Sequence, residues 1–358
     1  MKKFKAMLLA LIVTAAMTTG CAAGGNDSNS GVSDTTAPAE TTSAADAASL
    51  ETEKTDEETV QTTETAEPEN EGEDDEENYD TGDAALDNIR NQDGIGESEL
   101  LVISFGTSFN DSRRLTIGAI ENDLEAAFPD FSVRRGFTAN IVIDHVERRD
   151  GIHIDDINEA LDRAANNGVK TLVIQPTHLM NGIEYEEIVG KVANYSDAFE
   201  KVVFGEPLLT SDDDFKRVEK AITEWTAEYD DGETAVVFMG HGTEHEANGV
   251  YPKLQDMLTS DGYSNYFIGT VEAAPTLDDV LAAVKNGGYK RVILEPLMVV
   301  AGDHANNDMA GSDEDSWKTA FENEGYEVVC LLRGLGENEE IRQIYIDHAQ
   351  AAINSITE

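Results

Sequence analysis

An internal repeat constrains the fold of this chain more than any other feature of its sequence. The stretch from Arg291 to Gly311, RVILEPLMVVAGDHANNDMAG, is an apolar, β-branched run that stops at a proline and opens into a polar loop. Lys170 to Glu187, KTLVIQPTHLMNGIEYEE, has the same run, the same proline and a similar glycine-bearing loop. Self-similarity of this kind predicts two copies of one structural unit.

Two further pairs of segments repeat in the same order along the chain. ELLVISFGTS (Glu99 to Ser108) matches TAVVFMGHGT (Thr234 to Thr243), and KVVFGEPLL (Lys201 to Leu209) matches EVVCLLRGL (Glu327 to Leu335). The sequence therefore predicts two sister lobes with a cleft between them. We call residues 99–230 lobe 1 and residues 231–358 lobe 2.

Short β-branched runs alternate with helical patterns in both lobes, which predicts an α/β fold. The expected strands are Leu100 to Ser104, Ser132 to Phe137, Thr171 to Gln175, Lys201 to Phe204, Ala235 to Met239, Asn265 to Gly269, Arg291 to Glu295 and Glu327 to Leu331. Such alternation is typical of Rossmann-like lobes, each a four-stranded parallel sheet flanked by helices. Ligands of these sheets bind beyond the carboxyl ends of the strands, so the loops that follow the strands are the candidate site.

The first 21 residues have the features of a signal peptide. MKKFK is basic, AMLLALIVTAAM is a short apolar run, and TTGC ends in a cysteine after small residues. This pattern predicts a lipobox with Cys21 acylated, and hence a lipoprotein anchored to the membrane outside the cytoplasm. Thr18 stands where leucine is usual, so an uncleaved anchor or ordinary secretion stays open.

Residues 22–98 are rich in Thr, Ser, Ala, Asp and Glu, and we expect them to form an acidic, disordered tether. Its function would be either to attract cations or to hold the domain away from the membrane. The rest of the chain, from Glu99 onward, still has 49 acidic residues against 20 Lys and Arg. This acidity argues against nucleic-acid binding. Cys330, the only cysteine besides Cys21, has no disulfide partner if Cys21 is acylated and reads as a small buried hydrophobe.

The post-strand loops of lobe 2 combine two histidines with a carboxylate. They are MGHGTEH (Met239 to His245), GTVEAAP (Gly269 to Pro275) and AGDHANND (Ala301 to Asp308). Neutral imidazoles with a carboxylate suit a divalent metal such as Co, Ni, Fe or Zn. The equivalent loops of lobe 1 carry hydroxyls and a helix N-terminus, which favour anionic groups.

Five segments together resemble the anaerobic sirohydrochlorin cobaltochelatase family of class II tetrapyrrole chelatases. They are SFGTS, PTHLMNGIEYE, FMGHGTEH, VEAAP and LMVVAGDHANNDMAGSDEDSWK, and the resemblance covers essentially all of residues 99–358. It implies the two-lobed chelatase fold and a lyase of cobalamin biosynthesis with Co2+ as substrate metal, Fe2+ or Ni2+ being possible. It also implies that His241, Glu272 and His304 are the catalytic metal ligands.

Other residues receive roles from their position in the expected cleft. Thr107, Ser108 and Arg113 cluster at a strand-to-helix turn and are candidates to bind the carboxylates of a tetrapyrrole ring. His178 is the pseudo-equivalent of Met298, at the opposing lip, where it would shuttle protons or simply pack. Four further histidines are assigned as follows: His245 starts a helix or relays protons, and His145, His153 and His348 lie on the surface. Asp303 orients His304 or caps its loop.

The sequence thus predicts a lipid-anchored chelatase that inserts Co2+ into a sirohydrochlorin-like tetrapyrrole and releases two protons. The alternative is a non-catalytic, extracytoplasmic lipoprotein that binds haem, another tetrapyrrole or a divalent metal in the same cleft. Partners are then the ring, the metal and the membrane, with a homo-oligomer also possible. Expected export sets this chain apart, because corrinoid assembly is cytoplasmic.

Overall fold

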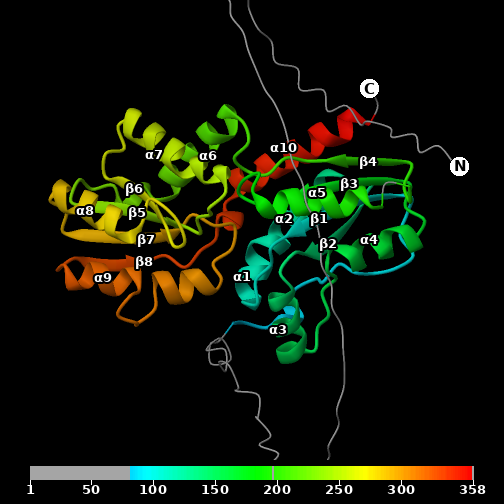
Figure 1. The fold of residues 1–358 in the computed structure, drawn as a ribbon, viewed down its shortest axis with the longest axis horizontal. Helices are drawn as coiled ribbons and strands as arrows, with labels where there is room; N and C mark the ends of the chain where they lie inside the picture. Colours follow the sequence, from blue (N-terminus) through cyan, green and yellow to red (C-terminus); the bar gives the residue numbers. More distant parts are fainter. Residues whose placement is uncertain (1–80, 196, 357–358) are drawn as a thin grey trace, which may run out of the picture. The chain divides into compact units, whose positions relative to one another are not determined.

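Two α/β lobes make up the part of the chain that the computed structural model describes, residues 81–195 and 197–356 (Figure 1). The first elements are η2 (Ala84–Leu86), β1 (Ser98–Ser104), α1 (Asn110–Leu115), α2 (Ile117–Ala127), β2 (Ser132–Phe137), α3 (Asn140–Asp150), α4 (Ile157–Asn166), β3 (Thr171–Pro176), α5 (Ile183–Ala193) and β4 (Lys201–Phe204). There follow α6 (Asp212–Trp225), η3 (Ala227–Tyr229), β5 (Thr234–Gly240), η4 (Glu246–Gly249), α7 (Val250–Ser260), β6 (Tyr266–Thr270), α8 (Leu277–Gly287), β7 (Arg291–Pro296), the π-helical η5 (Ala305–Met309), α9 (Trp317–Asn323), β8 (Glu327–Cys330), η6 (Leu335–Glu337) and α10 (Glu339–Ser355). The expected signal peptide and Cys21 lie outside the described residues.

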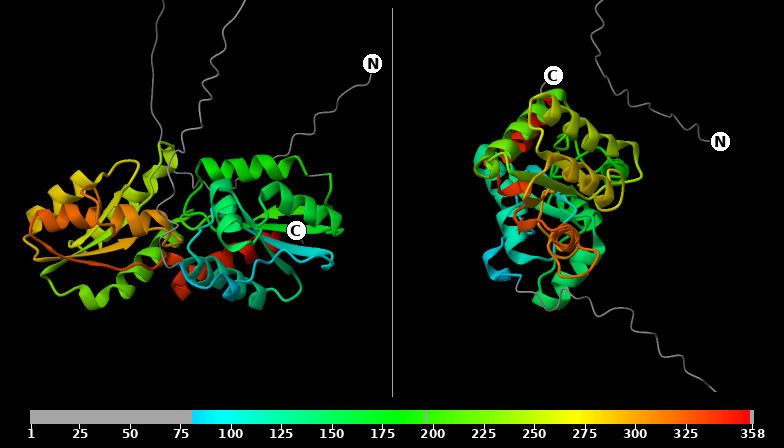
Figure 2. Two further views of the ribbon diagram at one scale, coloured as in Figure 1. Left: turned by 90° about the horizontal axis from the view of Figure 1, so that it is seen from below. Right: turned by 90° about the vertical axis from the view of Figure 1, so that its left-hand side faces the viewer.

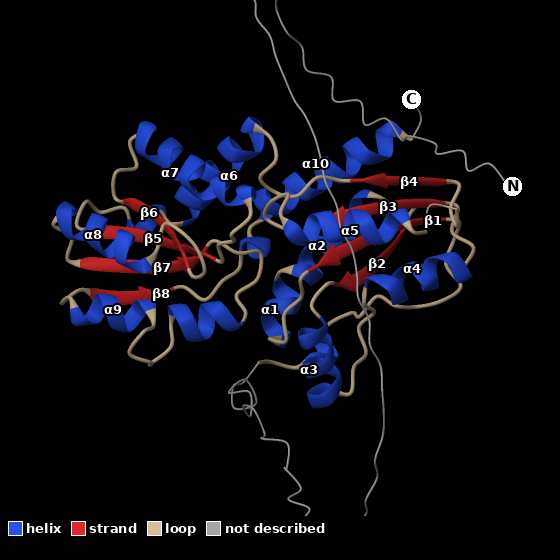
Figure 3. Ribbon diagram, in the orientation of Figure 1, coloured by secondary structure: helices blue, strands red, loops and turns tan. Residues whose placement is uncertain are grey.

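Each lobe has a parallel four-stranded sheet, and the two sheets have the same topology. The strand orders are β2-β1-β3-β4 in lobe 1 and β6-β5-β7-β8 in lobe 2, with all neighbours parallel. Helices cover both faces of each sheet (Figure 3). The predicted fold class is confirmed, and all eight expected strands are present with ends shifted by at most two residues.

The apolar runs become strands because both faces of each sheet are buried. Residues 100–103 of β1 and 235–239 of β5 are completely inaccessible to solvent, as expected for central parallel strands. The crossover helices begin at polar caps. Asp156 with Glu159 forms a reciprocal capping box at α4, and Thr276 with Asp279 forms another at α8. Local capping residues therefore determine where these helices begin, and burial of apolar side chains on both faces determines the strands.

The last helix, α10, packs on lobe 1 although the sequence predicted that residues 231–358 form lobe 2. Figure 1 and the left view of Figure 2 both place the red α10 beside lobe 1. The Tyr345 hydroxyl donates to the Thr177 carbonyl (2.8 Å), and the Arg342 guanidinium pairs with Asp123 of α2. Conversely, α6 contacts α7 of lobe 2, where Lys253 lies over the Phe215 ring. The predicted lobe 2 therefore does not include α10, whereas α6 lies between α10 and α7.

The segment just before β1 is also folded, contrary to the expected tether that reaches residue 98. Thr81 and Arg90 are only 7% and 2% exposed, and Asp87 forms buried ion pairs with lobe 1. A charged segment folds here because its charges find partners, which a count of acidic residues does not reveal. No helix among the described residues has the length and apolarity needed to cross a bilayer.

Candidate metal centre

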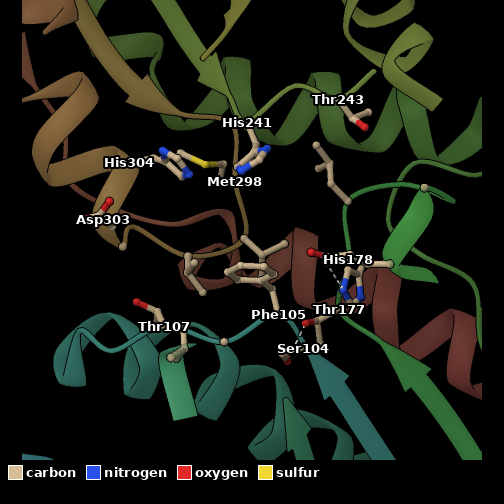
Figure 4. A pocket seen from close by; sticks show the side chains of 18 of the residues that line it. Ser104, Phe105, Thr107, Thr177, His178, His241, Thr243, Met298, Asp303 and His304 are labelled. Atoms are coloured by element: carbon tan, nitrogen blue, oxygen red, sulfur yellow. Dashed lines mark hydrogen bonds and ion pairs between the residues drawn. The ribbon is translucent and has the colours of Figure 1, made fainter. Parts of the chain in front are cut away.

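A cavity of about 920 Å³ lies between the two lobes, at the carboxyl ends of the strands. Its walls come chiefly from the loops that follow β1, β3, β5, β6 and β7 and from helix α3. Figure 4 shows the labelled lobe 2 side chains His241, His304 and Met298 on one wall, and Phe105 and Thr107 of lobe 1 on the opposite wall. The volume is at the upper end of small-molecule sites, as a large planar ligand requires.

The three predicted metal ligands come together on the lobe 2 wall. One nitrogen from each of His241 and His304 and one oxygen of Glu272 all lie within 4.8 Å of one another. The two imidazole rings are edge-to-face with centroids 4.7 Å apart, and His241 Nδ1 is 3.6 Å from Glu272 Oε2. Two imidazoles and one carboxylate form a donor set suited to Co, Ni, Fe or Zn.

Backbone geometry explains why the two loops that carry His241 and Glu272 meet. The Glu272 amide donates to the His241 carbonyl at 2.8 Å, so the two ligands are joined at their main chains. Gly242 has φ 88°, and a Cβ at this position would stand 2.8 Å from the Ala273 nitrogen. Only glycine permits both this conformation and this approach, which is the physical reason for the glycine after His241.

Both imidazoles place Nδ1 against a hydrogen-bond acceptor, which makes Nε2 the candidate nitrogen for a metal. His241 Nδ1 lies 2.8 Å from the Gly242 carbonyl oxygen, which can only accept, so Nδ1 carries the proton. His304 Nδ1 lies 2.6 Å from Asp308 Oδ2 and donates to this carboxylate in the same way. A carboxylate or carbonyl behind a ligating histidine fixes its tautomer and raises its basicity.

The role of Asp308 was missed, because the sequence offered only Asp303, either to orient His304 or to cap its loop. The Asp303 carboxylate accepts from Asn307 Nδ2 at 2.6 Å and helps to form its loop instead. The spacing of four residues between His304 and Asp308 on a helical turn was a signal that could have identified the pair. His245 has the predicted capping role, because its Nδ1 accepts from the Ala247 amide at the start of η4.

The lobe 1 wall is apolar and partly exposed, which the sequence did not predict. Phe105, Ile141 and Ile183 line the cavity although 45%, 71% and 52% of their area is exposed. Exposed apolar side chains that gather at a cavity mark a binding surface. A flat aromatic side chain such as Phe105 is suited to contact the face of a planar ring.

His178 lies on the cavity wall of lobe 1, as predicted. Its side chain is only 9% exposed, and its Nε2 is 2.8 Å from Glu184 Oε2. His145 also lines the cavity and is 4% exposed, so the expectation that it lies on the surface was wrong. The helix that carries it, α3, turns the histidine inward between apolar neighbours, whereas its charged neighbours face solvent.

Of the three residues expected to bind ring carboxylates, Thr107 and Ser108 line the cavity and Arg113 does not. The Arg113 side chain is fully buried, and its Nε donates to Asp87 Oδ2 at 2.8 Å. Its Nη1 donates to the Thr107 carbonyl. Arg113 cannot reach a ligand in this arrangement, and the nearby start of α1 already has a partner because the Asp111 amide donates to the Thr81 carbonyl.

The remaining predictions on single residues have mixed outcomes. His153 is exposed as expected, and its pKa is raised, because the neighbouring Glu147 and Glu159 carboxylates outweigh partial burial. His348 is instead largely buried, with its Nδ1 near the Glu206 carbonyl and its Nε2 near Asp214. Cys330 is free, and burial raises the pKa of its thiol to about 11, consistent with the predicted packing role.

The described cavity wall is acidic and has no lysine or arginine. Its ionisable carboxylates are those of Glu184, Glu187, Glu272 and Asp303. This distribution favours a cation and disfavours a free polyanion. It also means that ring carboxylates bound here would meet hydroxyls, backbone amides or solvent rather than guanidinium groups.

The two-lobed parallel α/β fold, with two histidines and a glutamate at the strand ends of one lobe, defines a metal chelatase. The chain belongs to the cobalt chelatase (CbiK) family, whose family model matches residues 98–354. It is 40% identical over 259 residues to the sirohydrochlorin cobaltochelatase of Salmonella typhimurium, covering 72% of this chain and 97% of that protein. It is 31% identical over 276 residues to the sirohydrochlorin cobaltochelatase CbiKC of Nitratidesulfovibrio vulgaris, covering 76% and 97% of the two chains.

A solved structure agrees with the fold. SirB from Bacillus subtilis with Fe3+ superposes with a TM-score of 0.50 at 12% identity, covering 74% of this chain and 98% of that one. At this identity the likeness concerns the fold alone. The expected family and fold are therefore confirmed, while the roles of individual residues remain predictions.

Proposed function

We propose that this protein inserts Co2+ into sirohydrochlorin or a closely similar tetrapyrrole and releases two protons. The observation that carries the proposal is the pairing of a donor wall, His241, Glu272 and His304, with an apolar wall at Phe105 across one cavity. The two relatives named above are called sirohydrochlorin cobaltochelatases, and this chain covers 97% of each of them.

The geometry suggests how the metal is delivered. The side chains of His241, Glu272 and His304 keep 45%, 55% and 32% of their area exposed, so their donor atoms are accessible from the cavity. The Nε2 atoms of both histidines and a Glu272 oxygen would hold Co2+ at one face of the ring. Because the three ligands leave positions open, the pyrrole nitrogens can replace them one at a time.

Insertion requires that two pyrrole N–H protons leave as the cation enters. An imidazole nitrogen that holds the metal cannot accept a proton at the same time. Glu272 on the donor wall and the pair of His178 with Glu184 (2.8 Å) on the other wall are our candidates to accept these protons. Acceptors on both faces would let the two protons leave in opposite directions.

The assay for this proposal uses the purified chain with sirohydrochlorin and Co2+ and follows the optical spectrum of the metallated ring. We expect many equivalents of product per protein, and parallel runs with Fe2+ and Ni2+ establish the metal preference. Formation of a single equivalent that remains bound would instead identify a tetrapyrrole-binding protein. A His241→Ala/His304→Ala double variant supplies the background rate.

We also propose that the protein is exported and held at the membrane by a lipid on Cys21. The support is the sequence alone: a basic start, a short apolar run and the TTGC junction. Cell fractionation of Cys21→Ser tests it, since this variant should leave the membrane fraction. If the variant stays with the membrane, the apolar run is an uncleaved anchor.

A further inference from the structure

A segment upstream of the family-matched region reaches the metal centre through a chain of contacts. The family model begins at residue 98, but residues 81–92 pack on lobe 1, with Thr81, Asp87 and Arg90 buried. We call residues 81–92 the strap. Two parts of it contact the helix α1, which begins directly after the cavity-lining Thr107 and Ser108.

The strap contributes one of the two fully buried carboxylates in an ionic network under the cleft. Asp87 Oδ2 accepts from Arg113 Nε (2.8 Å) and Arg135 Nη1 (2.6 Å), and Arg135 is shared with the buried Glu121. Burial would raise the pKa of Asp87, but the Arg135 and Arg113 guanidiniums outweigh it and lower the pKa. Asp87 therefore stays ionised and balances two buried arginines.

Arg113 connects this network to the cavity. Its Nη1 donates to the Thr107 carbonyl at 3.2 Å and its Nη2 donates to Asn110, so one guanidinium fixes both the cavity loop and the start of α1. The strap holds the same place from the other side, because the Asp111 amide donates to the Thr81 carbonyl at 2.7 Å. Helix α1 is thus clamped at its first turn.

Helix α1 in turn supports the loop of lobe 2 that carries His304. The Ala301 amide donates to Ser112 Oγ at 3.0 Å across the two lobes. Gly302 lies so close to lobe 1 that a Cβ there would stand 2.8 Å from Thr107 Oγ1. Only Asp303 separates Gly302 from the metal ligand His304.

We infer that the strap is a positioning element of the metal centre. Asp87 fixes the position of Arg113 and of α1. Through the hydrogen bond to Ser112, α1 then fixes the position of the loop that carries His304. Asp87 and Ser112 do not touch the substrate and act through the position of His304. The inference rests on the proposed role of His304 as a ligand. It predicts that a residue outside the family-matched region controls metal affinity.

The test measures Co2+ binding by the full chain without any ring, from the visible d–d absorption of the bound ion or by calorimetry. Asp87→Asn keeps the shape of the side chain and removes its charge. We expect it to weaken Co2+ binding by about tenfold, the lower end of what loss of a supporting partner costs a metal site. Asp87→Glu keeps the charge and should recover part of the affinity.

The matched control is Asp155→Asn, also in lobe 1. Asp155 is 2% exposed, and both of its carboxylate oxygens accept from the Arg163 guanidinium. Because Arg163 lies on α4 and not on α1, this pair does not support the helix that contacts the His304 loop. Both variants should lower the thermal midpoint, but only Asp87→Asn should weaken Co2+ binding. The inference is overturned if Asp87→Asn binds Co2+ within twofold of the wild type, or if Asp155→Asn weakens binding by the same factor.

A second variant covers the case in which Asp87→Asn fails to fold. Ser112→Ala removes only the hydroxyl that accepts from Ala301 and leaves every charge in place. It should weaken Co2+ binding several-fold, and an unchanged affinity would break the proposed link between α1 and the His304 loop. Turnover with sirohydrochlorin is scored separately, so loss of the proposed function and loss of the positioning effect give different results.

Discussion

The two lobes share a backbone and differ in the chemistry placed on it. Ile103 of lobe 1 and Met239 of lobe 2 are equivalent positions in the two sheets. Each pairs with a glycine on one neighbouring strand and with a proline on the other. The loops then correspond one to one. The Ala139 amide donates to the Phe105 carbonyl as the Glu272 amide donates to that of His241.

In lobe 1 a different residue occupies the position equivalent to each proposed metal ligand. The lobe 1 equivalents of His241, Glu272 and His304 are Phe105, Ala139 and Glu184. Glu184 is matched to His304 because each lies two residues after a glycine, Gly182 or Gly302, whose carbonyl accepts from the amide four residues later. One copy of the unit thus has two imidazoles and a carboxylate, and the other an aromatic ring, a methyl group and a carboxylate. Differences at three positions thus give one wall a set of metal-binding donor groups and leave the other wall largely apolar.

Replacing a ligand by its lobe 1 equivalent should have the largest effect. His241→Phe removes one of three donors and leaves the other two too few to hold Co2+ in place. We expect kcat/KM for cobalt insertion to fall by at least about 100-fold. The measurement is the initial rate at several Co2+ concentrations, with circular dichroism to show that the fold is intact. Activity within tenfold of the wild type would exclude His241 from metal delivery.

Shortening the equivalent residue of lobe 1 should affect the ring and not the metal. Phe105→Ala removes an aromatic contact worth roughly 0.5–1.5 kcal/mol, so the KM for sirohydrochlorin should rise by about 2- to 13-fold. Co2+ binding without the ring should stay the same. A change in Co2+ affinity with an unchanged ring KM would reverse the roles assigned to the two walls.

Each wall also has a histidine paired with a carboxylate, and the two pairs should differ. Asp308→Asn weakens the acceptor behind His304 Nδ1, and we expect Co2+ affinity to fall by about tenfold. On the lobe 1 wall the comparable pair is His178 with Glu184, and Glu184→Gln should leave Co2+ affinity unchanged. Calorimetric titration of both variants with Co2+ makes the comparison, and equal losses would mean that the metal is shared between the lobes.

The sequence predicted the parts of this comparison that depend on local pattern. β-Branched runs located every strand, because central parallel strands must be apolar on both faces. The strand-end rule then brought His241, Glu272 and His304 together. What depends on contacts between distant segments was not predictable: the return of α10 to lobe 1, the burial of Arg113 by Asp87, and the inward position of His145. The pairing of Asp308 with His304 was not predicted, because the two residues are four apart on a helical turn and only the adjacent Asp303 was considered.

The acidity of the cavity makes ionic strength informative about the two walls. Sirohydrochlorin carries several carboxylates, and the described cavity wall offers carboxylates but no lysine or arginine. Salt screens like-charge repulsion, with a Debye length near ~10 Å at 0.1 M and ~3 Å at 1 M. The KM for the ring should therefore fall by about two- to threefold when salt rises from about 0.05 to 0.5 M. A KM that rises with salt would reveal a basic contact to the ring.

The smallest expected effect concerns the stability of lobe 1, which buries a carboxyl group where lobe 2 has a methyl group. Glu99 of lobe 1 and Ala235 of lobe 2 are equivalent positions in the two sheets. Burial raises the pKa of Glu99 to about 8, with Arg134 opposing this and Asp155 adding to it. The folded chain therefore keeps a proton that the unfolded chain loses above its ordinary value of 4.5, and stability must decline as pH rises from there to about 8.

Glu99→Gln places a neutral amide at the same position and should remove this part of the decline. Its unfolding midpoint should drop less than that of the wild type between pH 5.5 and 8.5, by roughly 3–6 °C for a chain of this size. The other titrating groups are common to both proteins, so the difference between the two curves isolates residue 99. Glu97→Gln is the matched control, since Glu97 lies two residues earlier and is exposed beside Lys170. Parallel curves for Glu99→Gln and the wild type would show that Glu99 is ionised in the fold, and that lobe 1 tolerates a buried charge without the cost expected here.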